Sequence, residues 1–193
     1  MSNWNLNEVS TSQKTEKKEY KKVDYLRTPG SYTCTVNGQL SEKEMEGYTG
    51  SPFLDFILYT SDGKKTKARF WTPKETDAPK TADFKRKLLK EFMINCGVKD
   101  FTNMSDALDQ VIGKRLQVCF TTQEYIGTDR ETNEPVVRTS LQYKFSKKVG
   151  ETIKYDAKYN RTLSPEQTMQ YNELHKLWSE TKTTVEDDDN LPF

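Results

Sequence analysis

"FLDFILYTSDGKKTKARFW", residues 53–71, decides the fold that this sequence predicts. Apolar and polar side chains alternate with a period of two on both sides of an Asp-Gly pair, which is a strong short-range signal of a β-hairpin. The stretch therefore predicts two antiparallel strands that share one buried face. That face is expected to carry Leu54, Phe56, Leu58, Thr66, Ala68 and Phe70.

The same alternation occurs before and after this hairpin, and it predicts three further strands. Each has one apolar face, which we expect to point into a common core. The inward residues are Tyr32, Cys34 and Val36 in the first strand, Leu116, Val118 and Phe120 in the fourth, and Val137, Thr139, Leu141, Tyr143 and Phe145 in the fifth. A polar connection joins the fourth strand to the fifth.

Between residues 81 and 97 the period changes to that of an amphipathic helix. Thr81 is the expected N-cap and Gly97 follows the expected C-cap. A shorter helix is predicted from Ser105, as its cap, to Ile112. A terminal helix is predicted to start at Ser164-Pro165. The apolar stripes are Phe84, Leu88, Phe92 and Cys96 in the first of these helices, and Tyr171, Leu174, Leu177 and Trp178 in the terminal one.

The order strand, hairpin, helix, hairpin predicts a mainly β (α+β) fold. It is that of a five-stranded Greek-key barrel with a helix between strands three and four, the OB-fold. At 193 residues we expect one core. The predicted divisions are a flexible leader (1–27), the barrel (28–149), an extension with the terminal helix (150–178), and a disordered linker with an acidic tail (179–193).

Composition and charge give a partial indication of the partner. Apolar residues make up 33% of the chain and charged residues 31%, so the core is small or part of the chain is unpacked. The net charge of +1 rises by four, to +5, when the acidic residues 186–189 are set aside. A basic body with an acidic end favours a polyanionic partner, or competition for one.

Several classes of function are disfavoured. The three cysteines, Cys34, Cys96 and Cys119, are far apart, and His175 is the only histidine. This spacing favours no metal site, no disulfide framework and no cofactor. No paired catalytic residues or phosphate loop appear, so we expect no enzymatic activity. No signal peptide or apolar span is recognised, which predicts a cytoplasmic protein without a membrane partner.

The outward face of the hairpin combines rings and cations, and it is the best candidate for a binding surface. Its residues are Phe53, Ile57, Tyr59, Lys65, Lys67, Arg69 and Trp71. Single-stranded nucleic acid binds such surfaces because bases stack on rings while cations follow the phosphates. A Lys-rich strand that protects a sheet edge, with Trp71 covering the barrel end, explains the same pattern. Asp55 is interpreted as a register or edge device rather than as a base.

The last two strands could extend a basic groove. Arg115, Arg138 and Lys144 lie on their outward faces, and Tyr125 and Arg130 are expected in the connection that OB-folds use to clamp a ligand. Isolated charges on a solvated sheet are the alternative interpretation.

The stretch "VEDDDNLPF", residues 185–193, places four carboxylates before Leu191, Pro192 and Phe193. An acidic run can be a solubilising tail only. An apolar tip preceded by carboxylates instead indicates a docking peptide for an apolar pocket with a basic rim. A flexible tail could also fold back on the basic body, so that removing it would tighten polyanion binding.

"DDDNLPF" resembles the C-terminal tip of bacterial single-stranded DNA-binding proteins, from which it departs at Leu191 and Asn190. The layout of "TPGSYTCTV", "TADFKRKLLKEFMINCGV", "IGKRLQVCFTTQEYIG" and "VVRTSLQYKFSKK" resembles phage-encoded single-stranded DNA-binding proteins of the OB-fold type. The first resemblance implies that Pro192 and Phe193 anchor a partner protein, with Asp187, Asp188 and Asp189 as an electrostatic guide. It does not identify the residues that contact DNA.

Together the resemblances imply a protein that coats single-stranded DNA during replication, recombination or repair, in the host cytoplasm if phage-encoded. Its tail would recruit a polymerase, helicase, primase, recombinase or nuclease. A protein–protein adaptor and an RNA-binding OB module are the alternatives, and assembly into a homo-oligomer through barrel edges or the terminal helix stays open.

Overall fold

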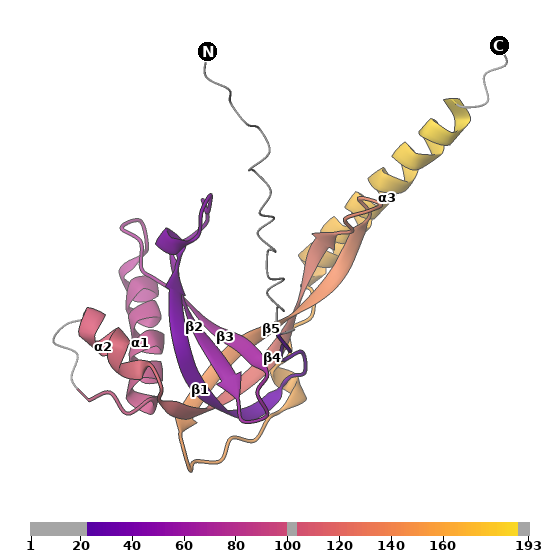
Figure 1. Cartoon of the computed structure of the whole chain (residues 1–193). Helices are drawn as coiled ribbons and strands as arrows, with labels where there is room; N and C mark the ends of the chain where they lie inside the picture. The colour runs from indigo at the N-terminus through magenta and orange to yellow at the C-terminus, as the bar shows by residue number, and fades with distance from the viewer. Residues whose placement is uncertain (1–22, 100–103, 189–193) are drawn as a thin grey trace, which may run out of the picture.

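A computed structural model describes residues 23–99 and 104–188 and shows a mainly β fold (Figure 1). Five antiparallel strands form one sheet in the order β3-β2-β1-β4-β5. The strands are β1 (Gly30–Ser41), β2 (Phe53–Thr60), β3 (Lys65–Trp71), β4 (Arg115–Thr128) and β5 (Pro135–Lys148). The helices are α1 (Pro79–Asn95), α2 (Met104–Val111) and α3 (Pro165–Asp188), with short 3-10 turns η1 (Glu42–Glu44) and η2 (Ala157–Tyr159).

The β2–β3 hairpin forms as its sequence predicts. Tyr59 pairs with Lys65, and the turn between them places Gly63 at φ 84°, which favours glycine. Its predicted inner face is confirmed: Phe56, Leu58 and Ala68 are completely buried. The same hydrophobic core contains the predicted inner residues of β1 and β4, as expected: Cys34, Val36, Leu116, Val118 and Phe120.

The sheet is curled but not closed. Within the described residues, no backbone pairing joins the two edge strands, β3 and β5. Aromatic rings bridge them instead: the Phe70 ring of β3 lies 5.0 Å from the Tyr143 ring of β5. Phe92 of α1 stacks on Phe56 at 4.6 Å and touches both edge rings. Burial raises the pKa of Tyr143 above its ordinary value, so its hydroxyl stays neutral and donates to Ser146 Oγ.

The boundaries of the first two helices differ from the prediction. α1 begins at Pro79. Proline suits the first position of a helix because its fixed φ is already helical, and because the N–H that it lacks would have no partner in the first turn. Thr81 is therefore inside the helix and not its cap. α1 ends as predicted, with Gly97 at φ 85° and the Val98 N–H donating to Met93 O. α2 begins at Met104, so Ser105 lies in its first turn.

A β-bulge changes the inner face of β5. Phe120 pairs with Tyr143 but Cys119 pairs with Phe145, which leaves Lys144 as an extra residue. The prediction that Phe145 points into the core is therefore wrong: its ring packs edge-to-face on Tyr159 of η2, with centroids 6.0 Å apart.

The inward position of Phe145 is taken by Ser146, which is buried. Its backbone oxygen accepts a hydrogen bond from Asn95 Nδ2 at 2.9 Å. The bulge thus ties the end of β5 to the end of α1.

β4 and β5 continue beyond the sheet as a two-stranded arm, residues 121–142 (Figure 1). β1 pairs with β4 only as far as Phe120, so the arm has no strand neighbour from the sheet. Val137 and Thr139, predicted to point inward, are exposed here because the alternation continues past the core. The free edge of β4 is taken by Arg161, which exchanges backbone hydrogen bonds with Thr122 and Glu124.

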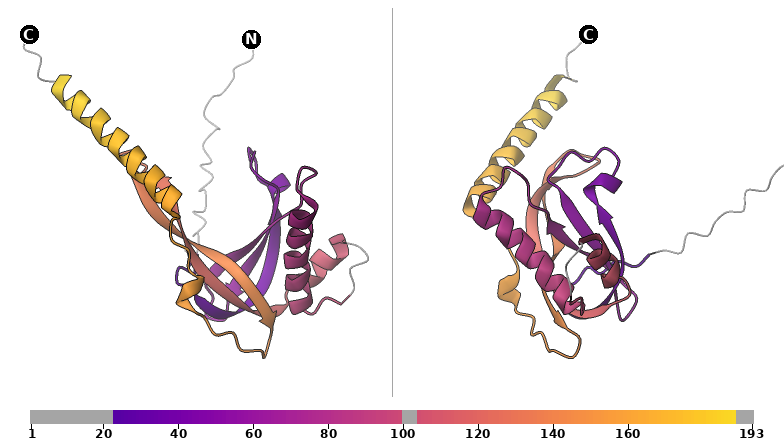
Figure 2. Two further views of the ribbon diagram at one scale, coloured as in Figure 1. Left: turned by 180° about the vertical axis from the view of Figure 1, so that it is seen from behind. Right: turned by 90° about the vertical axis from the view of Figure 1, so that its left-hand side faces the viewer.

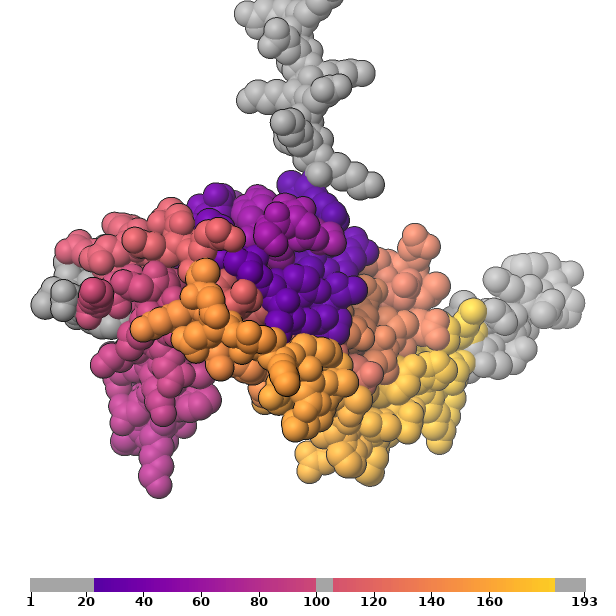
Figure 3. Space-filling model, turned by 90° about the horizontal axis from the view of Figure 1, so that it is seen from below, coloured from indigo at the N-terminus to yellow at the C-terminus, as the bar shows by residue number. Residues whose placement is uncertain are grey.

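α3 lies along the arm and extends its projection from the body (Figure 2). The Trp178 indole donates to Thr132 O at 3.2 Å, and His175 Nε2 lies 3.3 Å from a Glu134 carboxylate oxygen. The helix continues to Asp188, so the linker predicted from residue 179 is helical as far as that residue. The segment that connects the end of β5 to η2 crosses the lower face of the molecule (Figure 3).

The predicted leader also contains a folded part. The Leu26 side chain belongs to the hydrophobic core, and its N–H donates to Lys65 O on the outer edge of β3. Within the predicted leader, Tyr25 thus forms an isolated bridge with Lys65 of the edge strand β3. Of the described helices, none is long and apolar enough to span a membrane.

The three cysteines are small core side chains. Cys34, Cys96 and Cys119 are buried, and burial raises the pKa of Cys34 and of Cys96 to about 12. Their thiols are therefore protonated at neutral pH, and they contribute packing rather than reactivity.

Replacing Phe92 by alanine tests the ring bridge. We expect Phe92→Ala to lower the free energy of unfolding by about 3–5 kcal/mol, because it removes the ring that contacts both sheet edges. Phe84→Ala, on the exposed face of the same helix, is the control and should change it by less than about 0.5 kcal/mol. Urea unfolding followed by circular dichroism measures both. Equal effects of the two substitutions would contradict the bridging role.

Candidate functional site

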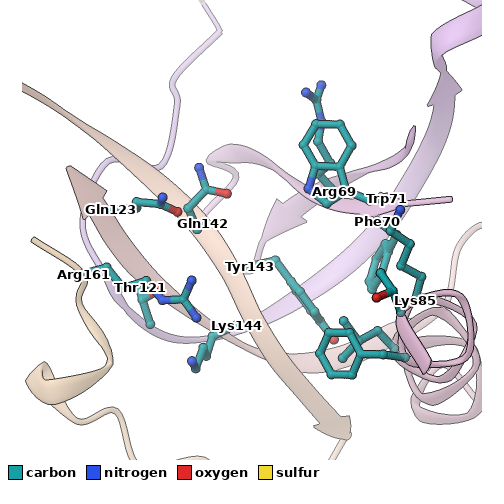
Figure 4. Close-up of a pocket in the computed structure, with 13 residues that line it drawn as sticks. Arg69, Phe70, Trp71, Lys85, Thr121, Gln123, Gln142, Tyr143, Lys144 and Arg161 are labelled. Atoms are coloured by element: carbon teal, nitrogen blue, oxygen red, sulfur yellow. The ribbon is translucent and has the colours of Figure 1, made fainter. Parts of the chain in front are cut away.

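A groove opens where the edges of β3 and β5 approach each other and α1 passes beside them (Figure 4). Its volume is about 480 Å³. We call it the cationic groove. Its lining comprises Arg69, Phe70, Trp71, Thr81, Phe84, Lys85, Leu88, Thr121, Gln123, Gln142, Tyr143, Lys144 and Arg161. The groove exists because the two edges are held together by rings and not by a backbone ladder.

Four of these side chains are cations and none is a carboxylate. Lys85 is paired with Asp77 at 2.7 Å, and this hydrogen bond lowers the pKa of the Asp77 carboxyl. Within the described part of the chain, Lys144 and Arg161 have no carboxylate within 4.0 Å. Lys144 lies over the Tyr159 ring, 5.9 Å from its centroid. Lys144 and Arg161 are therefore the two cations of the groove that are best placed to bind an anionic ligand.

The third cation of this surface is fixed by a buried carboxylate. Asp55 is 3% exposed and accepts two hydrogen bonds from Arg69, from Nε and Nη2, each 2.7 Å long. Lys67 Nζ, on a largely exposed side chain, lies 3.1 Å from the same carboxyl group. The bond to Asp55 raises the pKa of Arg69. Asp55 thus orients two cations of β3 from beneath, a more specific role than the register device predicted for it.

The prediction that Phe53 stacks on a base is wrong. Its ring is completely buried because three neighbours cover it. The Arg69 guanidinium lies over one face, 3.8 Å from the ring centroid. Tyr48 and Trp71 contact it edge-on, at 5.0 and 6.2 Å. Alternation places Phe53 on the outward face of β2, but Tyr48 from the loop after β1 helps to cover its ring. Phe53 therefore supports the binding surface from below.

Two aromatic rings of the groove are open to solvent. Trp71, a predicted contact, is 45% exposed, and Phe84 is 60% exposed. The apolar stripe predicted for this helix includes Phe84. A spacing of four residues drifts from the 3.6-residue turn, however, so Phe84 is rotated about 80° from Phe92 around the helix axis. This drift is the sequence signal that would have identified Phe84 as exposed.

The arm continues the lining of the groove. Thr121, Gln123 and Gln142 belong to the groove, and alternation places Tyr125 and Arg138 on the same face of the ribbon. Tyr125 and Arg138 are paired across the strands, and both are exposed. The predicted contacts Trp71, Arg69, Lys144, Tyr125 and Arg138 therefore share one surface.

Other predicted contacts lie elsewhere. Tyr59 and Lys65 flank the β2–β3 turn, at the opposite end of the hairpin from Trp71. Lys65 lies near the Tyr25 ring, 5.9 Å from its centroid. Arg115 is at the start of β4, opposite Thr35 and six residues before the first groove residue of that strand. Arg130 is in the exposed turn at the tip of the arm. The structure does not bring these residues to the groove.

Sequence reasoning missed Lys85 and Arg161, which come from α1 and from the segment that pairs with β4. Of the predicted tail, Asp189, Leu191, Pro192 and Phe193 lie outside the described residues. Asp187 and Asp188 are in the last turn of α3. In the described part of the chain, no group of three or more His, Cys, Asp or Glu side chains is placed to hold a metal ion.

Comparison of the sequence with known protein families and with curated proteins gives no match to either. The interpretation of the groove therefore depends on its own geometry.

The buried carboxylate provides a test of the site's construction. We expect Asp55→Ala to lower the free energy of unfolding by about 1–3 kcal/mol, because it leaves Arg69 without its partner in a partly buried position. Asp83→Ala, which breaks the exposed pair with Arg86, is the control and should leave unfolding unchanged. Thermal and urea unfolding measure the difference. If Asp55→Ala were as stable as the control, Asp55 would not hold this surface.

Proposed function

We propose that this protein binds single-stranded DNA in the cationic groove with little sequence preference. One observation carries the proposal: the groove combines four cations with two exposed rings and has no carboxylate in its lining. Single strands are bound by surfaces of this composition, since bases stack on aromatic faces and phosphates need cations. A groove for a neutral or cationic ligand would not be lined in this way.

The fold supports the same proposal. β1 pairs with both β2 and β4, the β3 and β5 edges meet through their rings, and α1 lies between strands three and four. We propose that this arrangement is an OB-fold in which the groove separates β3 from β5, the two edge strands of the sheet. OB-folds bind oligonucleotides on a strand face bounded by loops.

Each part of the groove has a role in this proposal. The Trp71 and Phe84 rings stack on bases, each contributing about 1–3 kcal/mol. Lys144 and Arg161 contact phosphates, and the Gln123 and Gln142 amides hydrogen-bond to bases or sugars (Figure 4). The strand then leaves along the arm, past Tyr125 and Arg138. Stacking accepts any base, which is why we propose little sequence preference.

The proposed biological role is to coat and protect single-stranded DNA during replication, recombination or repair, in a phage-infected cell. The support is the resemblance of "DDDNLPF" to the tip of bacterial single-stranded DNA-binding proteins. On the same basis the acidic tip recruits replication or recombination proteins. We propose no enzymatic activity and no cofactor for this chain.

Titration with oligo-dT tests the proposal directly. We expect quenching of Trp71 fluorescence in a Trp4→Phe, Trp178→Phe background, because the indole stacks on a base. With two to four phosphates neutralised, the slope of log K against log salt should be about −1.5 to −3. Absence of quenching, or an affinity independent of salt, would exclude the groove as a DNA site. An rU oligomer bound more tightly than dT would favour the RNA-binding alternative.

Substitutions in β5 distinguish a groove contact from general charge. Lys144→Ala should weaken dT binding and reduce the salt slope by about 0.7–1, because one phosphate contact is lost. Lys147→Ala removes the same charge three residues along, outside the groove, and should do neither. Trp71→Ala should weaken binding about 5- to 150-fold. An adaptor with no DNA function would show the same partner binding in all three variants, and no affinity for dT.

A further inference from the structure

A second groove lies on the other side of Trp71, between α1 and the start of β2. Its volume is about 570 Å³. We call it the apolar groove. It is lined by Ser41, Glu42, Lys43, Phe53, Leu54, Trp71, Thr72, Pro73, Lys85, Arg86, Leu89, Lys90, Met93 and Leu108. Trp71 and Lys85 line both grooves, so the two share a wall.

The floor of this groove is apolar. Leu54 and Met93 are buried core residues, and Leu89 and Leu108 pack on the core from α1 and α2. Such a floor suits a phenyl or branched aliphatic side chain, because transfer of apolar surface from water to an apolar environment is favourable. An elongated polyanion alone would gain nothing from this floor.

The rim is cationic. Four lining residues, Lys43, Lys85, Arg86 and Lys90, carry positive charge, and Glu42 is the one carboxylate. A Glu42 oxygen already accepts a hydrogen bond from the Phe53 N–H at 3.2 Å. Arg86 is paired with the exposed Asp83, at 3.0 Å. The groove therefore suits a ligand that joins apolar side chains to several negative charges.

The chain itself carries a segment with this chemistry. Residues 186–193, "EDDDNLPF", place its one run of four acidic residues one position before Leu191, Pro192 and Phe193, with Asn190 between them. The apolar residues match the floor, and the acidic run is opposite in charge to the rim. Proline restricts the backbone of the segment before binding, which lowers the entropy lost on docking.

The geometry of α3 excludes docking within the same molecule. α3 starts next to the cationic groove, just after Arg161, and its 24 residues carry the chain about 36 Å away. Residues 189–193 span at most about 18 Å. Figure 1 shows the end of α3 on the opposite side of the molecule from α1 and α2. The segment can reach an apolar groove only on another copy while α3 remains helical.

We propose that residues 186–193 of one copy dock in the apolar groove of a second copy, with Phe193 and Leu191 on the floor and the acidic residues on the Lys43–Arg86 rim. Such a contact joins two different surfaces, so it generates open chains of molecules rather than closed dimers. Because Trp71 and Lys85 belong to both grooves, docking and occupation of the cationic groove are coupled. The docking itself does not depend on DNA binding.

A labelled peptide of residues 186–193, added to the full-length protein without DNA, tests the docking by fluorescence anisotropy. We expect saturable binding that weakens at least tenfold for Arg86→Glu and for Leu108→Asp. Arg86 is exposed, so its variant keeps the test valid if Leu108→Asp does not fold. Lys87→Glu reverses the same charge on the adjacent position of α1, outside the groove, and should bind within twofold of wild type.

A peptide with alanine in place of Phe193 should also bind at least tenfold more weakly. Absence of peptide binding, or equal loss in the Arg86→Glu and Lys87→Glu variants, would overturn the proposal. Because no DNA is present, a protein that binds the peptide but not dT would contradict only the proposed function. The reverse result would contradict only the docking.

Sedimentation velocity of the full-length protein tests whether the occupant is a second copy. The average mass should rise with concentration and fall with added salt, and Phe193→Ala or Arg86→Glu should abolish the rise. A protein that stays monomeric at every concentration while binding the peptide would overturn docking between copies.

Discussion

The contact of the Phe92 ring with Phe56, Phe70 and Tyr143 is the interaction on which the remaining structure depends. It holds together two strand edges that share no backbone hydrogen bonds. Were β3 and β5 paired as a ladder, their side chains would pack against each other and no groove would open between them. Because rings span the gap instead, Trp71, Lys144 and the flanking residues of α1 face a common space. One packing constraint thus sets both the core and the candidate site.

Much of the sheet could be predicted from the sequence, because period-two alternation reports directly which face of a strand is buried. The β2–β3 hairpin and the inner residues of β1 and β4 follow from it. The failures have physical causes. A single inserted residue, Lys144, reverses the alternation and turns Phe145 outward. On the other strand face, Phe53 and Asp55 are covered by a loop and by β3 cations, and alternation cannot report what a distant segment covers.

The candidate site was only partly accessible to sequence reasoning for the same reason. Trp71, Arg69 and Lys144 belong to strands whose outward faces follow from the alternation, so the sequence predicts them as contacts. Phe84, Lys85 and Arg161 come from a helix and from an irregular segment, which tertiary packing brings to the strands. No local pattern reports that approach. Similarly, the Ser/Thr/Lys/Glu composition of residues 179–186 indicates a linker, whereas the structure has a continuous helix there. The helix contacts the arm through His175 and Trp178, and Leu174 and Leu177 of the predicted stripe are exposed.

The central place of β1 has a consequence for how the chain acquires its structure. β2–β3 and β4–β5 are hairpins of neighbouring residues, which form within microseconds. β1 must also pair with β4, and this pairing joins Thr33 to Gln117, which is 84 residues further along the chain. Contacts between residues so far apart in the sequence slow folding. The chain loses conformational entropy when it closes the long loop, before packing provides any stabilisation. During synthesis, the first half of the chain therefore emerges with a strand that cannot complete its pairing until β4 leaves the ribosome.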